Sequence, residues 1–126
     1  MAHVPINPPG SPPPMAPYSH AVKAGNTIYI SGVVAVDQDG HTVGMNDCGA
    51  QTRFIIERIK TIVEAAGGTL ADVAFNHVFL KDLNDYTAMN AVYREYFTSS
   101  PPARYCIRAD LVKPEFLVEI ASVVHL

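Results

Sequence analysis

The strongest constraint on the fold is a helical repeat of apolar residues in the middle of the chain. The repeat follows the i, i+4, i+7, i+8, i+11 spacing of one helix face, at Ile55, Ile59, Ile62, Val63 and Ala66. Asp47 is suited to the N-cap of this helix, and Gly67-Gly68 to its end. A second helix is predicted from about residue 84 or 85 to 97, burying Met89, Val92, Tyr93 and Tyr96.

β-prone runs surround both helices. They cover residues 19–24, 27–34, 73–81, 101–107 and 116–124, with a possible short strand at 41–43. Gly25-Asn26 is a turn dipeptide that joins the first two runs as a hairpin. In the run 73–81, alternation predicts one shared face for Val73, Phe75, His77 and Phe79. The order ββ(β)αβαββ predicts an α+β fold with two helices on one face of a sheet. The strands offer more apolar surface than a monomer should expose, so another copy of the chain is expected to cover the other face; this surface includes Val33, Ile107, Val118, Ile120 and Val124.

The first 17 residues differ in composition from the rest. They contain seven of the ten prolines, which excludes a helix or a central strand. We therefore expect a proline-rich arm over residues 1–17 and a single domain over residues 18–126, a length that can bury a proper core.

Composition narrows the possible partners. The net charge of −3, with nine Lys plus Arg, does not favour nucleic acid or an anionic membrane. Two cysteines make no disulfide framework, and no signal peptide or membrane span is predicted, so we expect a cytoplasmic protein. The five histidines show no metal-ligand spacing, so no metal site is predicted.

A charged residue stands in each of the last two predicted strands. Glu119 interrupts an otherwise apolar run, and Arg104 shares a strand face with Cys106. An unpaired buried carboxylate costs several kcal/mol, which makes Arg104 the natural partner of Glu119. A planar guanidinium also binds carboxylate ligands through two parallel hydrogen bonds. The residues alone leave both roles of Arg104 open, the structural partner and the clamp for a small acid.

Short motifs along the chain resemble those of one known family. They are Ala16-Pro17-Tyr18, Ile30-Ser31-Gly32, Ala50-Gln51-Thr52-Arg53, Lys81-Asp82, Met89-Asn90-Ala91-Val92-Tyr93 and Pro102-Ala103-Arg104-Tyr105-Cys106. In order and spacing, from about Pro9 to the carboxyl end, they resemble the reactive intermediate deaminase (Rid, or YjgF-like) family. Three further segments are most similar to its pyrimidine-utilisation (Rut) branch, residues 67–72, 111–114 and 118–121.

The resemblance implies a chorismate-mutase-like fold, a homotrimer with clefts between subunits, and no cofactor. It also implies hydrolysis of a carboxylate-bearing enamine or imine to a carbonyl compound and ammonia. The branch favours 3-aminoacrylate, giving malonic semialdehyde, with 2-aminomuconate and 2-aminoacrylate as alternatives. Carried onto this sequence, Arg104 binds the substrate carboxylate, Glu119 positions water, and Cys106 lies in the cleft. Tyr18, Ser31 and Asn90 line the site, and the role of His20 is open.

Each of these residues also has an ordinary structural interpretation. Glu119 could form a core salt bridge, and Tyr18 could anchor the arm to the sheet. Ser31 could satisfy a backbone group, and Asn90 could be a solvated helix position. Cys106 has no histidine near it in sequence, so a small buried residue that offers its backbone is favoured over a nucleophile.

Two functions of other classes stay open beside the deaminase. Some relatives carry names such as endoribonuclease or translation inhibitor, which imply RNA as the partner. Against this stand the acidic net charge and the lack of a basic stripe interleaved with aromatic residues. A non-catalytic trimeric ligand-binding or chaperone-like module is the other possibility.

Overall fold

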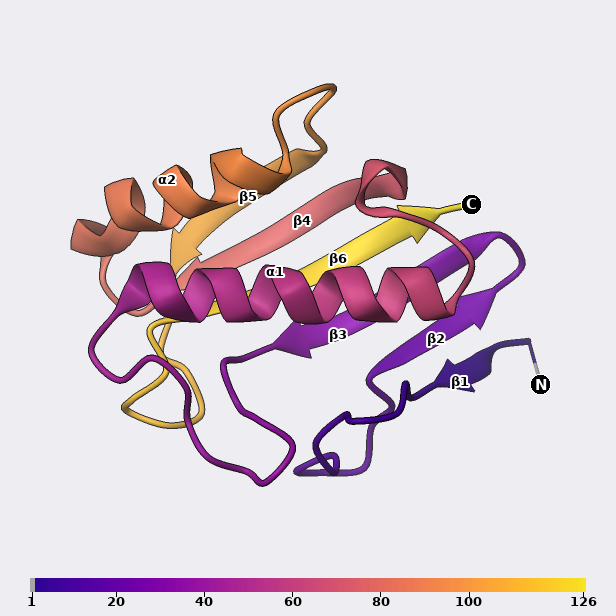
Figure 1. The fold of residues 1–126 in the computed structure, drawn as a ribbon, viewed down its shortest axis with the longest axis horizontal. Coiled ribbons are helices and arrows are strands. Elements are labelled where there is room, and N and C mark those ends of the chain that lie inside the picture. Colours follow the sequence, from indigo (N-terminus) through magenta and orange to yellow (C-terminus); the bar gives the residue numbers. More distant parts are fainter. Residues whose placement is uncertain (1) are drawn as a thin grey trace.

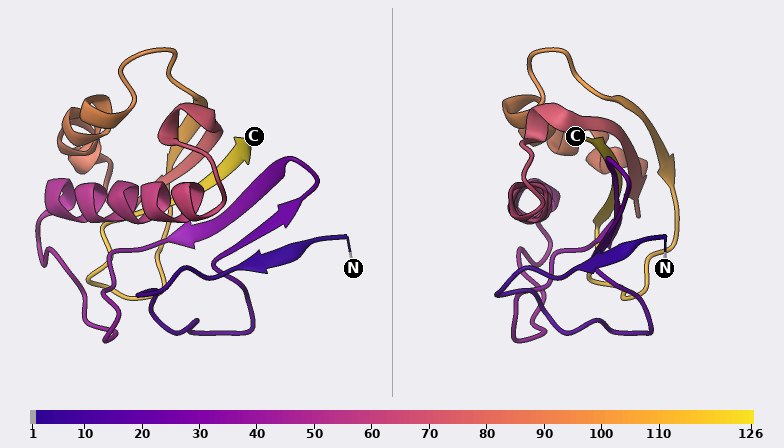
Figure 2. Two further views of the ribbon diagram at one scale, coloured as in Figure 1. Left: turned by 45° about the vertical axis from the view of Figure 1, so that its right-hand side comes forward. Right: turned by 90° about the vertical axis from the view of Figure 1, so that its right-hand side faces the viewer.

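The computed structural model describes residues 2–126 and contains one six-stranded sheet and two α-helices. The elements in chain order are β1 (Val4–Ile6), β2 (Ala21–Ala24), β3 (Thr27–Val33), α1 (Cys48–Ala65), β4 (Val73–Leu80), α2 (Tyr86–Tyr96), β5 (Ala103–Arg108) and β6 (Val118–His125). Two single-turn 3-10 helices, Leu70–Asp72 and Leu83–Asp85, precede β4 and α2. Both α-helices lie on the same face of the curved sheet (Figures 1 and 2), which confirms the predicted α+β architecture.

The strand order is β1-β2-β3-β6-β4-β5. All neighbouring pairs are antiparallel except β4 and β5, which are parallel and are joined through α2. The last strand of the chain, β6, is therefore inserted between β3 and β4 in the middle of the sheet (Figure 1). Strands β5 and β6, which are consecutive in sequence, do not pair with each other because β4 lies between them.

Local sequence signals explain where these elements begin and end. The Asp47 side chain accepts a hydrogen bond from the Ala50 amide at 3.0 Å, as an N-cap does. Gly67 has a φ of +92° just after α1, a conformation that favours glycine. Gly25, with a φ of +60°, lies in the turn between β2 and β3. The possible strand at residues 41–43 is only an isolated bridge between Val36 and Thr42.

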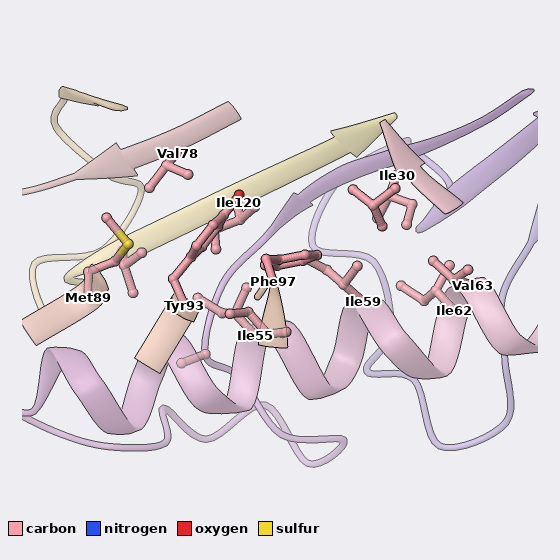
Figure 3. Packing of buried hydrophobic residues seen from close by; sticks show 14 of the residues in the cluster. Ile30, Ile55, Ile59, Ile62, Val63, Val78, Met89, Tyr93, Phe97 and Ile120 are labelled. Carbon is pink, nitrogen blue, oxygen red and sulfur yellow. The ribbon is translucent and has the colours of Figure 1, made fainter. Parts of the chain in front are cut away.

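The core lies between the helices and the sheet. The predicted face of α1 is buried there, with Ile55, Ile59 and Val63 fully buried, and Met89 and Tyr93 reach in from α2 (Figure 3). Short polar contacts cross this layer: Ser122 Oγ donates to Asn76 Oδ1 at 2.6 Å, and Asn76 Nδ2 donates to the Tyr93 hydroxyl at 2.9 Å. The buried amide is thereby satisfied, and the Tyr93 ring is held in place.

The other face of the sheet is not covered by any described element of the chain. Side chains on this face include Tyr29, Phe75, Phe79, Tyr105, Ile107, Ala121 and Val123. Tyr29, Tyr105 and Ile107 are 50%, 41% and 48% exposed. We call this set the open sheet face.

Two predictions about strand faces are wrong. Val118, Ile120 and Val124, expected to need a cover from another copy, are fully buried under the helices. Val73 does not share the face of Phe75, because the register of β4 against β6 shifts between them. The extra residue of a β-bulge turns the following side chain to the opposite face, which simple alternation cannot anticipate.

The proline-rich arm is partly ordered by the sheet. Its residues Val4–Ile6 form the edge strand β1, which pairs with β2. His20 holds the rest of the arm, since its backbone amide donates to Asn7 Oδ1 at 3.1 Å and its Nε2 lies 2.6 Å from the Pro12 carbonyl oxygen.

No helix within residues 2–126 has the length and hydropathy that crossing a bilayer requires.

Candidate active site

The predicted pair between Arg104 and Glu119 does not form within one chain. Arg104 is aligned with the buried Asn76 of β4, whereas Glu119 is aligned with Phe79 of the same strand. Positions 76 and 79 point to opposite faces of β4, so Arg104 faces α2 and Glu119 faces the open side. Among residues 2–126 the ion pairs join Arg53 to Glu95 and His41 to Asp37, and neither Arg104 nor Glu119 takes part.

Arg104 is held by aromatic and sulfur groups of α2. Its Cζ lies 4.6 Å from the centroid of the Tyr93 ring and 5.8 Å from that of Tyr86. Its Nη2 donates to the Tyr86 hydroxyl at 3.3 Å, and its Nη1 lies 3.9 Å from Met89 Sδ. These contacts fix the guanidinium without a carboxylate, so N–H groups stay available to an acidic ligand.

A groove of about 300 Å³ opens beside Arg104 and is lined by Tyr86, Asn90 and Tyr93. These three side chains follow one another at i, i+4 and i+7 along one face of α2. Of them, Asn90 is a predicted site residue, whereas Tyr86 was not anticipated from the sequence. The repeated polar and aromatic spacing was the signal that could have found it. We call Arg104 with this lining the arginine half of the site.

Cys106 lies on the same strand face as Arg104 but does not have the properties of a nucleophile. Burial raises the pKa of its thiol above the ordinary 9.0, and the nearby Arg104 charge only partly offsets this. A raised pKa keeps the sulfur protonated at neutral pH, and thiolate is the reactive form. The raised pKa therefore favours the predicted role of Cys106 as a small, partly buried residue over a covalent role.

Glu119 lies on the open side, against Gly32 of β3. A Cβ atom on Gly32 would be 2.2 Å from Glu119 Oε2 and 3.0 Å from its Cδ, so the carboxylate occupies the space that a side chain at position 32 would need. The register of β3 against β6 shifts between Ile30 and Val33, next to this glycine. Burial raises the pKa of Glu119 above the ordinary 4.5.

Tyr18, His20 and Ser31 gather near Gly32, in the wall of a cavity of about 370 Å³ under the arm. The Ser31 hydroxyl donates to the Ser19 carbonyl at 2.7 Å, so it fastens β3 to the segment before β2. Tyr18 is 40% exposed, and its ring meets His20 edge-on with the ring centroids 6.3 Å apart. Glu119 does not line this cavity, and we call Glu119 with Gly32 the glutamate half of the site.

Gln51 of α1 connects the helix layer to the start of β6. Its side-chain amide donates to the carbonyls of Gly44 and Glu115 at 3.1 and 2.9 Å, and its Oε1 accepts from the Leu117 amide at 2.9 Å. The side chain is fully buried and uses both amide protons. It thereby fixes the segment that carries Glu119 into the sheet.

The group of possible metal ligands found within residues 2–126 is Asp37, Asp39 and His41, on an exposed turn. Asp37 Oδ1 already accepts the Asp39 and His41 amides at 3.0 and 2.9 Å. This is the pattern of an Asx turn, which accounts for the cluster.

The comparison with known proteins decides the family. The model of the family described as Endoribonuclease L-PSP matches residues 9–126. The chain belongs to this Rid (YjgF-like) family. The Rid-family chain is 53% identical over 120 residues to 3-aminoacrylate deaminase RutC of Acinetobacter baylyi, with 95% of each sequence covered.

Solved structures of relatives agree with the fold. RidA from the Antarctic bacterium Psychrobacter sp. superposes with a TM-score of 0.87 at 36% identity, covering 96% of this chain and 98% of that one. The YjgF gene product of E. coli superposes with a TM-score of 0.88 at 32% identity, covering 97% and 98%. The arrangement of two helices on a mixed sheet is thus that of the Rid family.

Proposed function

We propose that this protein is a cofactor-free hydrolytic deaminase of small enamine or imine acids, with 3-aminoacrylate as its substrate. The observation that carries the proposal is a guanidinium held by aromatic rings, with donors available in a groove, in a chain 53% identical to a 3-aminoacrylate deaminase. Water and 3-aminoacrylate give malonic semialdehyde and ammonia, and neither a redox change nor a metal is needed to balance this reaction.

In the proposed mechanism Arg104 binds the substrate carboxylate and Glu119 moves protons. The enamine carbon takes a proton to give an imine, water attacks the imine carbon, and the departing nitrogen takes a further proton. A carboxyl group whose pKa is raised by burial keeps its proton to a higher pH than an exposed one and can release it again. Tyr18, Ser31 and Asn90 line the cleft, and Cys106 offers its backbone.

We propose further that the two halves belong to one cleft formed by neighbouring subunits of a homotrimer. The halves face opposite sides of the sheet, so a single chain does not bring Arg104 to Glu119. The open sheet face, with Tyr29, Tyr105 and Ile107 about half exposed, is an apolar surface that a second copy could cover. Two free cysteines, Cys48 and Cys106, fit a reducing compartment, and we place the trimer in the cytoplasm.

Ammonia release is the test of the activity. Each of 3-aminoacrylate, 2-aminoacrylate and 2-aminomuconate is generated in the assay, and the rate with protein is compared with the unaided rate, because such enamines also hydrolyse spontaneously. We expect the largest acceleration with 3-aminoacrylate. No acceleration with any of the three would overturn the enzymatic function, and a preference for another acid would reassign the substrate.

Mixing two impaired variants tests the shared cleft. Arg104→Lys and Glu119→Gln proteins are unfolded together and refolded at equal concentrations. In a head-to-tail ring, about one cleft in four then combines an intact Arg104 with an intact Glu119 from its neighbour. We expect the mixture to recover about a quarter of the wild-type activity; activity equal to the mean of the two variants would place both groups in one chain.

Light scattering should give about three times the chain mass of 13.6 kDa.

A further inference from the structure

Tyr86 stands beside Arg104 in the groove but is not among the predicted site residues. It begins α2, its side chain lines the groove, and the residue is 45% exposed. An exposed aromatic residue at a helix start usually has no specific partner. Here the hydroxyl accepts a hydrogen bond from Arg104 Nη2 at 3.3 Å, and the Tyr86 ring lies 5.8 Å from the Arg104 Cζ.

The Tyr86 hydroxyl has a second neighbour one helical turn along, Asn90. A hydrogen bond from the Asn90 side chain, followed by the hydrogen bond from Arg104, lowers the pKa of the Tyr86 hydroxyl below the ordinary 10.0. A phenol oxygen accepts through its lone pairs and donates its single proton. With Arg104 donating to the oxygen, the hydroxyl proton is left for another group, and the groove adjoins it.

We propose that Tyr86 is a substrate-binding residue whose hydroxyl donates a hydrogen bond to the same carboxylate that Arg104 binds. The carboxylate would thus be held by donors from two elements, Arg104 on β5 and Tyr86 on α2. This inference rests on the proposed function, because it assigns a further contact in the same site. It also explains the use of tyrosine at position 86: the ring packs near the guanidinium, and only the hydroxyl reaches a ligand oxygen.

The ligand that tests the contact is crotonate, in which a methyl group replaces the amino group of 3-aminoacrylate. It keeps the carboxylate and the double bond but cannot be deaminated, so binding is measured separately from turnover. Crotonamide, the neutral counterpart, reports on contacts that do not depend on the carboxylate charge. Both are titrated by ligand-observed NMR into wild type, Tyr86→Phe and Tyr96→Phe.

Tyr96→Phe is the matched control. Tyr96 lies on the same helix and also has an arginine near its ring, with Arg53 Cζ 6.0 Å from the centroid, but it does not line the groove. We expect crotonate to bind roughly 10- to 100-fold more weakly to Tyr86→Phe, the loss of one hydrogen bond to a charged group. Crotonamide should lose less affinity, and Tyr96→Phe should bind both ligands as wild type does.

A pH titration separates a donor from a residue that only holds Arg104 in place. When Tyr86 loses its proton it can no longer donate, and its negative charge repels the carboxylate. Crotonate binding to wild type should therefore weaken as the pH rises, at a pH below 10.0. The other titratable groups near the hydroxyl are Arg104, Arg94, Tyr93 and Cys106. All four are retained in Tyr86→Phe, which should lack this component of the alkaline loss.

The outcomes distinguish this inference from the proposed function. Weaker crotonate binding to Tyr86→Phe together with the missing alkaline loss supports the inference, even if wild type turns over none of the three enamines. Unchanged crotonate affinity in Tyr86→Phe overturns it, even if wild type is an active deaminase. A wild-type protein that binds no crotonate overturns it as well. Thermal melting checks that both phenylalanine variants are folded.

Discussion

The arginine half and the glutamate half of the site differ in how far one chain builds them. Arg104 is fixed by Tyr93, Tyr86 and Met89, all from α2, so this half is assembled inside the subunit. Glu119 has a glycine beside it and no ion-pair partner among residues 2–126, and it lies next to the open sheet face. Packing within one chain is therefore enough to fix the Arg104 guanidinium, whereas the surroundings of the Glu119 carboxylate depend on what covers the open sheet face.

The largest expected effect comes from the glutamate half. Glu119→Gln keeps the size of the side chain but removes the proton transfer, so we expect kcat to fall by about 10²- to 10⁴-fold. Crotonate affinity should stay close to that of wild type, because the carboxylate clamp lies in the other half. Steady-state ammonia release and the crotonate titration measure the two quantities; a normal kcat would remove Glu119 from the chemistry.

Arg104→Lys probes the arginine half with the positive charge retained. Lysine cannot make two parallel hydrogen bonds or stack a planar group on Tyr93, so we expect kcat/KM to fall by roughly 10- to 1000-fold. Arg53→Lys, at the exposed ion pair with Glu95, is the matched control and should change kcat/KM very little. If Arg104→Lys turns over normally but melts far below wild type, Arg104 is a structural residue.

Gly32→Ala tests whether the space beside β3 positions the carboxylate. The added methyl group would be 2.2 Å from Glu119 Oε2, so the carboxylate must turn away. We expect kcat to fall by roughly tenfold or more with the fold kept, since a displaced acid–base group loses its geometry. In Gly49→Ala, the control, the nearest atom would be 3.5 Å away and no change in kcat is expected. Equal kcat values in Gly32→Ala and Gly49→Ala would show that the space at Gly32 does not position the Glu119 carboxylate.

The smallest expected effect is on stability. The pKa of Glu119 is raised by burial above its ordinary 4.5, so the unfolded chain releases this proton at lower pH than the folded one. The stabilising contribution is present below the unfolded value and is lost as the pH rises through the folded value. Denaturant midpoints at pH 4 and pH 8 should therefore fall less with pH in Glu119→Gln than in wild type. Glu64→Gln, on the exposed side of α1, is the control. If the denaturant midpoint falls equally with pH in Glu119→Gln and Glu64→Gln, burial does not raise the pKa of Glu119.

Much of the fold could be predicted because its signals are local. The 3.6-residue period from Ile55 to Ala66, the Asp47 cap and the Gly25-Asn26 turn each act over a few residues, and the structure has all three. The family motifs, in their order, indicated the two helices on one sheet face. One failure depended on a single extra residue: the bulge between Val73 and Phe75 reversed the face assigned to Val73.

For the candidate site, the sequence by itself determined which residue types stand out, because a guanidinium and a carboxylate in apolar strands are costly to bury without a partner. Only the tertiary structure decided which groups meet. The insertion of β6 between β3 and β4, and the register of β4 against its two neighbours, put Arg104 and Glu119 on opposite faces and brought Tyr86 to Arg104. Strand order and register are set by long-range packing of the whole sheet, and no short stretch of sequence contains that information.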